Sequence, residues 1–299
     1  MTTNQFEHVA RSWIAKALYT NPVDVPDVLY HYTDASGLVG MLQSGVVWAT
    51  DLRFLNDRQE QRHFCGASRS YVETVLSNDS ASEAAKKLCI EILKYHLISS
   101  NDHRFVFSLS ADSDDLSQWR GYGRDGRGYT VGLNGPLIFK TAEPDDAQFG
   151  FAKVEYLHER QSGVISKIFD DILIELIKKT SNGIDENLIE DAARWYDYAI
   201  ENCSALNKHK SFVREGEWRV ISVISEDEKD HIKVRSSGDR LVPYLDLYLA
   251  GEAEKLPVMS IGIGPGFAES DERHAVEALC RQHGYAPEIY FADTPYRRT

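Results

Sequence analysis

The stretch FVFSLSADSDDLSQWRGYGRDGRGYTVGLN, which spans Phe105–Asn134, carries the strongest indication of how this chain folds. It opens with the apolar run FVFSLS, which predicts a strand that ends in two hydroxyl side chains. It closes with GYTVGLN, which predicts a second strand. Between the strands, Gln118–Gly123 supplies a tryptophan, an arginine and a tyrosine, and Gly126 and Gly128 follow in a loop. Aromatic side chains, an arginine and glycines between two strands indicate the wall of a pocket.

The composition limits the classes of protein that this chain can be. Its 299 residues carry a formal net charge of −13, whereas a general nucleic-acid binder needs a basic surface. The cysteines form no C-x-x-C pair, which argues against a zinc knuckle or a disulfide framework. They are Cys65, Cys89, Cys203 and Cys280. The first residues lack the apolar core of a signal peptide, and no apolar run approaches the roughly 18 residues that cross a bilayer. We therefore expect a cytoplasmic protein.

The pattern of apolar residues predicts an α+β fold. Helical spacing covers residues 5–18, the segment that ends at Gly45, and residues 62–77, 80–99 and 159–207. Strand patterns cover residues 28–33, 46–50, 152–157 and 217–225, and a strand, a helix and a further strand end the chain. We predict a mixed or antiparallel sheet with flanking helices. The chain is expected to form a single domain over residues 1–299, with a helical hairpin inserted at about 159–207.

The first predicted strand, VLYHYT, contains a histidine that could serve a site. Because side chains alternate along a strand, His31 and Tyr32 are expected to point to opposite sides. A lone histidine in an apolar strand is commonly a core residue with its hydrogen bonds satisfied. The functional alternative is that His31 donates a hydrogen bond to a ligand hydroxyl.

Two carboxylates precede the strand WRVIS. Glu215 and Glu217 are two residues apart, so an extended chain points them to the same side. A buried carboxylate is costly unless it is paired or used. One interpretation is a salt bridge to Arg214 or Arg219. The other is stabilisation of a cationic transition state.

The opening stretch offers two further pairs of side chains. Ser108 and Ser110 are expected to share one side of their strand, where serines more often cap or turn the chain than react. No G-x-S-x-G motif surrounds them, so a serine hydrolase has no support. Trp119 and Tyr122 would lie side by side on a helical turn. They are either core residues or a platform on which a flat ring stacks.

The glycines of GIGPG lie between a predicted strand and a predicted helix. Backbone amides at Gly262, Gly264 and Gly266 could hold a phosphate. The segment matches neither a Walker A loop nor G-x-G-x-x-G, so a structural turn is the favoured interpretation.

A metal site is a further alternative. It would combine His31, Asp57, His63 and Glu217, but their spacing matches no known ligand pattern. Asn56 and Asp57 are better explained as the N-cap of the following helix.

Several short motifs recur together in a bacterial family of uncharacterised proteins that this chain resembles. They are LYHYT (Leu29–Thr33), WATDLRFLND (Trp48–Asp57), FSLS with a W-x-x-Y segment (Phe107–Tyr122), GRG (Gly126–Gly128), EWR (Glu217–Arg219) and PYR (Pro295–Arg297). The order of elements also resembles that of the ADP-ribosyltransferase superfamily, although the aromatic spacing and the insertion at 159–207 depart from it.

That resemblance implies roles for named residues. His31, with Tyr32 and Thr33 beside it, would contact the ribose on the nicotinamide side of NAD. Glu217 would bind the ribose 2′-hydroxyl and stabilise the oxocarbenium-like transition state, and Glu215 would help to activate the acceptor.

The resemblance also implies residues that bind the rest of NAD. Ser108, Ser110 and either Tyr122 or Trp119 would shape the nicotinamide pocket. The pyrophosphate would be neutralised by Arg53, Arg58 or Arg120.

Three functions follow from these patterns. The first is an NAD-dependent ADP-ribosyltransferase or NAD glycohydrolase, such as a toxin or phage-defence effector, with NAD as substrate, no metal and a protein or nucleic acid as acceptor. The second is a catalytically silent module that binds a nucleotide or a partner. The third is a metal-dependent hydrolase or nuclease.

Overall fold

The computed structural model describes residues 5–18, 22–55, 58–95, 103–142, 149–156, 158–179, 185–224, 226–237, 239–251, 254–267 and 269–295. The chain divides into two compact units. The helical unit comprises Met1–Tyr19, Leu52–His103 and Val154–Phe212. The sheet unit comprises Thr20–Asp51, Arg104–Lys153 and Val213–Thr299.

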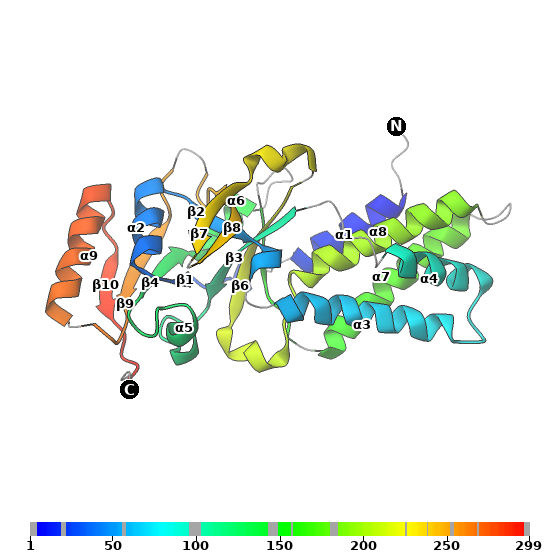
Figure 1. Cartoon of the computed structure of the whole chain (residues 1–299), viewed down its shortest axis with the longest axis horizontal. Coiled ribbons are helices and arrows are strands. Elements are labelled where there is room, and N and C mark those ends of the chain that lie inside the picture. The colour runs from blue at the N-terminus through cyan, green and yellow to red at the C-terminus, as the bar shows by residue number, and fades with distance from the viewer. Residues whose placement is uncertain are drawn as a thin grey trace. The chain divides into compact units, whose positions relative to one another are not determined.

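The helical unit is built around α8. Its helices are α1 (Gln5–Leu18), α3 (Arg58–Leu76), α4 (Glu83–Tyr95), α7 (His158–Lys179) and α8 (Glu186–Ser204), with the short 3₁₀ turn η2 (Leu52–Phe54) (Figure 1). Helix α8 packs against each of the other four helices. Their apolar faces meet in one core around Phe64, Phe169 and Tyr196, where the Tyr196 hydroxyl lies 2.8 Å from Ser68 Oγ. The helices predicted over 159–207 are therefore α7 and α8, and three earlier helices share their core.

The sheet unit carries one large, mostly antiparallel sheet. Its strands are β1 (Val28–Thr33), β2 (Val47–Asp51), β3 (His103–Ser110), β4 (Tyr129–Asn134), β5 (Gly150–Lys153), β6 (Glu217–Ile224), β7 (Lys233–Ser237), β8 (Arg240–Leu247), β9 (Val258–Ile263) and β10 (Glu288–Phe291). Among the described residues they are ordered β10-β9-β4-β1-β3-β2-β8-β7, and β6 pairs with both β3 and β5. Because β9 and β10 run parallel, the sheet is mixed, as the sequence predicts.

Short helices connect the strands of the sheet unit. They are α2 (Ala35–Ser44), α5 (Leu116–Gly121), α6 (Gly135–Ala142) and α9 (Glu269–His283), with the 3₁₀ turns η1 (Pro22–Asp24), η3 (Lys210–Glu215) and η4 (Glu226–His231). Asp34 caps α2 by accepting a hydrogen bond from the Gly37 amide over 2.9 Å. Gly45 ends α2 in a left-handed conformation with φ 71°, which glycine adopts without strain.

Strand alternation gives the sheet two chemically different sides. The core side carries the buried apolar residues, which include Leu29, Val47, Ala49, Phe105, Phe107, Leu109, Val131, Leu133, Trp218, Val220, Leu245 and Leu247. Residues of α2, α6 and α9 complete this core. The polar side carries the intervening residues, which include Tyr30, Tyr32, Trp48, Thr50, Ser108, Ser110, Thr130, Glu217, Arg219 and Tyr244. The strand pairing keeps these residues on one side, because Tyr30 lies opposite Ser110 and Thr50 lies opposite both Val106 and Tyr244.

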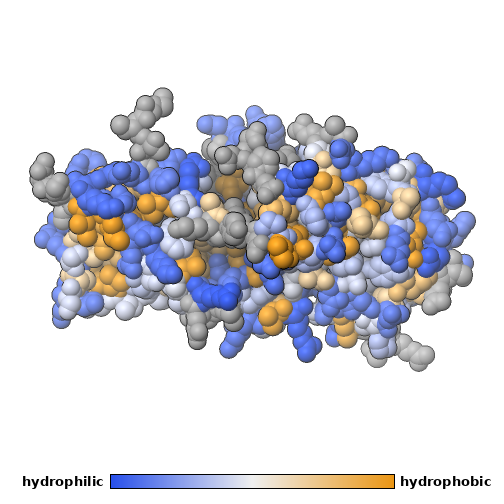
Figure 2. Space-filling view, turned by 180° about the vertical axis from the view of Figure 1, so that it is seen from behind, coloured by the Kyte–Doolittle hydropathy of each residue, from blue (hydrophilic) through white to orange (hydrophobic). Residues whose placement is uncertain are grey.

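Hydrophobic side chains also reach the surface. On the face shown in Figure 2, hydrophobic residues form separate groups among hydrophilic ones. On α7, Ile174 and Ile177 are 47% and 49% exposed. Scattered exposure of this kind is ordinary for a protein surface. Within the described residues, the helices are too short or too polar to cross a membrane.

Candidate functional site

Three neighbouring strands bring the histidine, serine and glutamate motifs together. Strand β3 pairs with β1 and with β6, so the serine strand lies beside both the histidine strand and the glutamate strand. At the end of β3, the Ser110 hydroxyl donates to the Glu215 carbonyl over 2.7 Å. The Ala111 amide donates to the Gly216 carbonyl over 3.1 Å. Segments that are more than 70 residues apart in sequence therefore meet at one end of the sheet.

Glu217 forms a buried ion pair on the polar side. Both of its carboxylate oxygens accept from Arg219, with Nε···Oε1 at 2.8 Å and Nη2···Oε2 at 3.1 Å. The two residues are 5% and 3% exposed. A bidentate pair of this kind offsets part of the cost of removing both charges from water. The sequence analysis named Arg214 or Arg219 as the partner in a salt bridge, and the structure shows Glu217 paired with Arg219.

His31 lies on the core side of β1. Its ring stacks on Phe107 with centroids 4.3 Å apart, and its Nδ1 lies 3.0 Å from the Ser108 carbonyl oxygen. Because a carbonyl can only accept, Nδ1 carries the hydrogen and Nε2 is left as an acceptor. Burial lowers the pKa of His31 to about 4, the Ser108 hydrogen bond opposes that change, and the positive charge of Arg235 adds to it. His31 is therefore neutral at pH 7.

The position of His31 changes the role expected from the sequence. His31 and Tyr32 point to opposite sides, as predicted, but the apolar side is the one that His31 occupies. Alternation along β6 puts Glu217 on the opposite side from Trp218 and Val220, which belong to that same core. The donor hydrogen at Nδ1 is already held by Ser108, so the ring can offer a ligand only an acceptor. Thr33 shares the core side and lies opposite Tyr129.

Tyr32 anchors the loop that follows β3. Its hydroxyl donates to the Asp112 carbonyl and accepts from the Asp115 amide, both over 2.9 Å. Its ring meets Trp119 edge to face at 4.9 Å. Trp119 Nε1 donates to Asp114 over 2.7 Å. These contacts fix the loop against the polar side of β1.

The expected stacking platform of Trp119 and Tyr122 does not form as a pair. Trp119 is completely buried, whereas Tyr122 is 40% exposed and follows the end of α5. The core interpretation therefore holds for Trp119, because its ring packs against Tyr32 and over Gly123. Of these two aromatic residues, only Tyr122 has an accessible ring.

A row of polar residues on the same side was missed by the sequence analysis. Tyr290 of β10 lies 3.1 Å from Thr130 Oγ1, and its ring covers Gly262, where an added Cβ would come within 2.7 Å of Tyr290 Cζ. Tyr30 lies over Gly132 in the same way, with 3.1 Å between an added Cβ and its Cε1. Burial raises the pKa of both tyrosines. Alternation along VLYHYT could have grouped Tyr30 with Tyr32, but only the strand order brings Tyr290 to them.

The glycines of GIGPG make a structural turn, as favoured from the sequence. The Gly264 amide donates to the Gly128 carbonyl over 3.0 Å, and the Gly266 amide donates to the Gly126 carbonyl over 2.9 Å. These two amides are therefore occupied by the neighbouring loop rather than directed at a phosphate.

The arginines expected to bind pyrophosphate lie in different parts of the chain. Arg120 is exposed on α5 of the sheet unit. Arg53 belongs to the helical unit, where its Nη2 lies 2.8 Å from His103 Nδ1. The side chain of Arg58 lies outside the described residues.

The metal hypothesis involves residues that the structure does not describe. Asn56, Asp57 and the side chain of His63 lie outside the described residues, as does the end of the PYR motif. Within the described part of the chain, no three His, Cys, Asp or Glu side chains gather in a way that could hold a metal ion.

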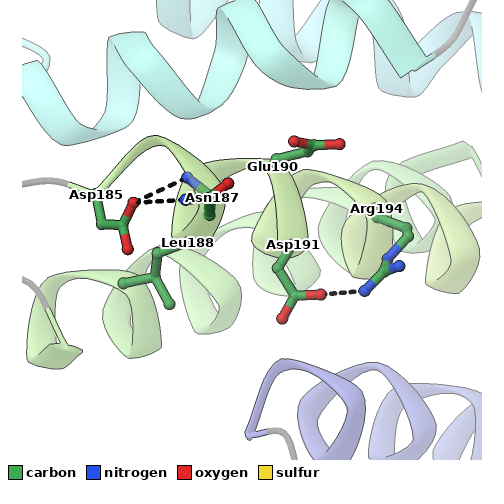
Figure 3. A pocket seen from close by; sticks show the side chains of 6 residues that line it. All are labelled: Asp185, Asn187, Leu188, Glu190, Asp191 and Arg194. Atoms are coloured by element: carbon green, nitrogen blue, oxygen red, sulfur yellow. Dashed lines mark hydrogen bonds and ion pairs between the residues drawn. The ribbon is translucent and has the colours of Figure 1, made fainter.

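A pocket lies on the first turns of α8, and some of its polar side chains form hydrogen bonds and ion pairs within that helix. Figure 3 shows the residues that line it, which are Asp185, Asn187, Leu188, Glu190, Asp191 and Arg194. Asp185 caps the helix by accepting from the Asn187 amide over 3.1 Å, and Asp191 pairs with Arg194.

Comparison with known protein families gives a match over part of the chain. Residues 118–220 match the model of a family described as "Protein of unknown function (DUF2971)", which covers roughly a third of this chain. That match begins in α5 and ends within β6, so it includes Glu217 and Arg219. No curated protein and no solved structure was found to match the chain.

Proposed function

We propose that this chain binds NAD over the polar side of β1, β3 and β6 and cleaves the bond between nicotinamide and ribose. The observation that carries the proposal is the adjacency of these three strands, with Ser110 joined to Glu215 at their common end. The order of histidine, serine and glutamate strands in the sequence supports the same function through its resemblance to ADP-ribosyltransferases. The activity would be that of an ADP-ribosyltransferase or NAD glycohydrolase, in a toxin or phage-defence effector.

The proposed reaction needs one carboxylate beside the ribose. The bond between ribose C1′ and the nicotinamide nitrogen breaks, and nicotinamide leaves as a neutral ring with the bonding electron pair. The positive charge that develops at C1′ is stabilised by Glu217, whose ionised form Arg219 favours. Water or an acceptor nucleophile then bonds to C1′ and loses a proton, with Glu215 as the group that would accept it.

The other residues would position the substrate. Tyr122 offers an exposed ring for nicotinamide, and Tyr32 with Ser110 holds the adjoining loop in place. His31 would act from the core side by fixing β1 against β3 through Ser108. This role replaces the direct contact with ribose that the sequence suggested.

A second candidate is a silent module that binds a nucleotide without cleaving it. It is favoured by the burial of Glu217, which is 5% exposed and pairs with Arg219 through both oxygens, because a buried ion pair of this kind can serve the structure alone.

Nicotinamide release from NAD separates the two candidates. The protein is incubated with NAD, with and without protein and nucleic-acid acceptors, and nicotinamide is quantified. We expect release by the native chain and a loss of about 10²-fold or more in Glu217→Gln, since loss of a transition-state contact of this kind costs that much.

Two controls keep the result interpretable. Glu217→Gln leaves Arg219 without its charge partner, so the variant Glu217→Gln with Arg219→Gln tests the loss of the carboxylate without leaving a buried charge unpaired. ADP-ribose binding by calorimetry reports whether the site is intact. Release that survives both substitutions removes the role of Glu217. Binding of ADP-ribose by the native chain without any release identifies the silent module.

A further inference from the structure

Arg235 is a half-buried cation on the polar side of the sheet that the sequence analysis did not single out. It lies in β7, and its guanidinium group lies over the Trp48 ring with 5.7 Å to the centroid. Its Nη2 donates to Thr50 Oγ1 over 3.0 Å. Its Nε is buried and finds no acceptor among the residues that the structure describes. A buried arginine donor without an acceptor is rare and calls for an explanation.

The surroundings of Arg235 form an ordered aromatic and hydroxyl frame. Thr50 lies opposite Tyr244, and Arg235 lies opposite Val242, so alternation puts all of these side chains with Trp48 on one side of β2, β8 and β7. The Trp48 and Tyr244 rings lie 5.2 Å apart. A planar guanidinium held over an indole keeps its donors oriented, which suits it to a planar or tetrahedral anion.

The carboxylates near Arg235 are already paired with other groups. The negative charge of Asp34 interacts with Arg235. Asp34 also accepts hydrogen bonds from the Gly37 amide and the Ser36 hydroxyl at the start of α2, and its carboxylate lies 3.5 Å from Arg124. Asp246 forms an ion pair with Lys233. The positive charge of Arg235 therefore stays available to an anion.

We propose that Arg235 binds a phosphate group of the nucleotide ligand, with Thr50 and Trp48 holding its guanidinium in place. The proposal deepens the proposed function and rests on it, because it names the residue that neutralises the NAD pyrophosphate. Strand pairing supports it: Thr50 lies opposite Val106 of β3, and Val106 shares the polar side with Ser108 and Ser110. The charge of Arg235 also reaches His31 of β1. In this proposal Arg235 neutralises the pyrophosphate, a role for which the sequence suggested Arg53, Arg58 or Arg120.

Calorimetric titration with ADP-ribose tests this proposal without requiring turnover. We expect Arg235→Gln to weaken ADP-ribose binding by about tenfold or more, because a charge-assisted hydrogen bond to phosphate is removed. Arg235→Lys keeps the charge but not the planar fork and should fall between the two. Binding of adenosine, which has no phosphate, should be the same in all three proteins.

Lys233→Gln is the matched control. It removes a positive charge from the same side of the same strand, but Lys233 is exposed and pairs with Asp246. Its ADP-ribose affinity should stay within about twofold of the native value, because an exposed pair contributes little. Thermal unfolding of each variant confirms that β7 is intact before binding is compared.

The outcomes distinguish the two proposals. Equal ADP-ribose affinity in the native chain and in Arg235→Gln overturns the role of Arg235, while NAD cleavage by the native chain would leave the proposed function in place. Equal weakening in Arg235→Gln and Lys233→Gln also overturns it, since the effect would be that of overall charge. Absence of ADP-ribose binding and of NAD cleavage in the native chain overturns both.

Discussion

The Ser110 hydroxyl donates to the Glu215 carbonyl over 2.7 Å, although 105 residues separate them in the sequence. The same oxygen accepts from the Asp112 amide over 3.1 Å. One buried side chain therefore joins the end of β3, the loop that follows it and the turn that precedes β6. This is the point at which the serine and glutamate motifs meet.

Ser110→Ala should destabilise the fold more than Ser108→Ala. Loss of the Ser110 hydroxyl, which is itself buried, removes two part-buried hydrogen bonds, and this costs about 1–3 kcal/mol in the free energy of unfolding. Ser108 is the matched control, because His31 contacts its backbone carbonyl rather than its side chain. Urea unfolding of the two variants measures the difference. Equal midpoints would show that the Ser110 bond does not stabilise this end of the sheet.

Glu217 and Arg219 should behave as a coupled pair. Arg219→Met alone deprives a buried carboxylate of its cation, and we expect a loss of about 3–5 kcal/mol in the free energy of unfolding. Glu217→Met alone should cost a similar amount. The double variant should recover most of the loss, because two apolar side chains replace both charges. Urea unfolding of all four proteins gives the coupling energy, and additive losses would contradict this account of the pair.

Local patterns predicted part of the site because they report neighbours along the chain. Alternation in VLYHYT was enough to predict that His31 and Tyr32 point to opposite sides. Which side is apolar depends on Val131 and Phe107, which come from strands 70 or more residues later. The same dependence on distant strands explains why the sequence did not show that a neighbouring strand uses the Nδ1 hydrogen of His31.

The helices follow the same rule, because their caps and apolar spacing can be seen in the sequence whereas their packing partners cannot. Helix α6 was not predicted from the sequence, although the sequence contains its capping residue. Asn134 caps the helix by accepting a hydrogen bond from the Leu137 amide over 2.9 Å. The helices at 159–207 could be predicted from their apolar spacing. Their shared core with α1, α3 and α4 could not, because helical spacing identifies a buried face without naming what buries it.

Gly262→Ala should destabilise the sheet, whereas Gly66→Ala should not. A Cβ at Gly262 would overlap Thr130 Oγ1 and come within 2.7 Å of Tyr290 Cζ, and relieving such an overlap typically costs about 1–3 kcal/mol. A Cβ at Gly66, in the middle of α3, meets no atom of the described residues within 4 Å outside the neighbouring backbone of its own helix. There the helical preference of alanine should add up to about 1 kcal/mol to stability. Thermal unfolding compares them, and a stabilised Gly262→Ala would refute the packing of Tyr290 over the sheet.

The stability of the fold should depend on pH through His31. The pKa of His31 is about 4 in the folded chain, against an ordinary value of 6.5, so the unfolded chain binds more protons between these values. The contribution of His31 to stability is therefore complete above pH 6.5 and is lost as the pH falls towards 4. In this window the native chain should lose up to about 1.4 kcal/mol more per pH unit than His31→Asn, which cannot titrate. Urea unfolding of the native chain and of His31→Asn at a series of pH values measures the difference. Parallel curves for the native chain and His31→Asn would mean that the folded structure accommodates a charged His31.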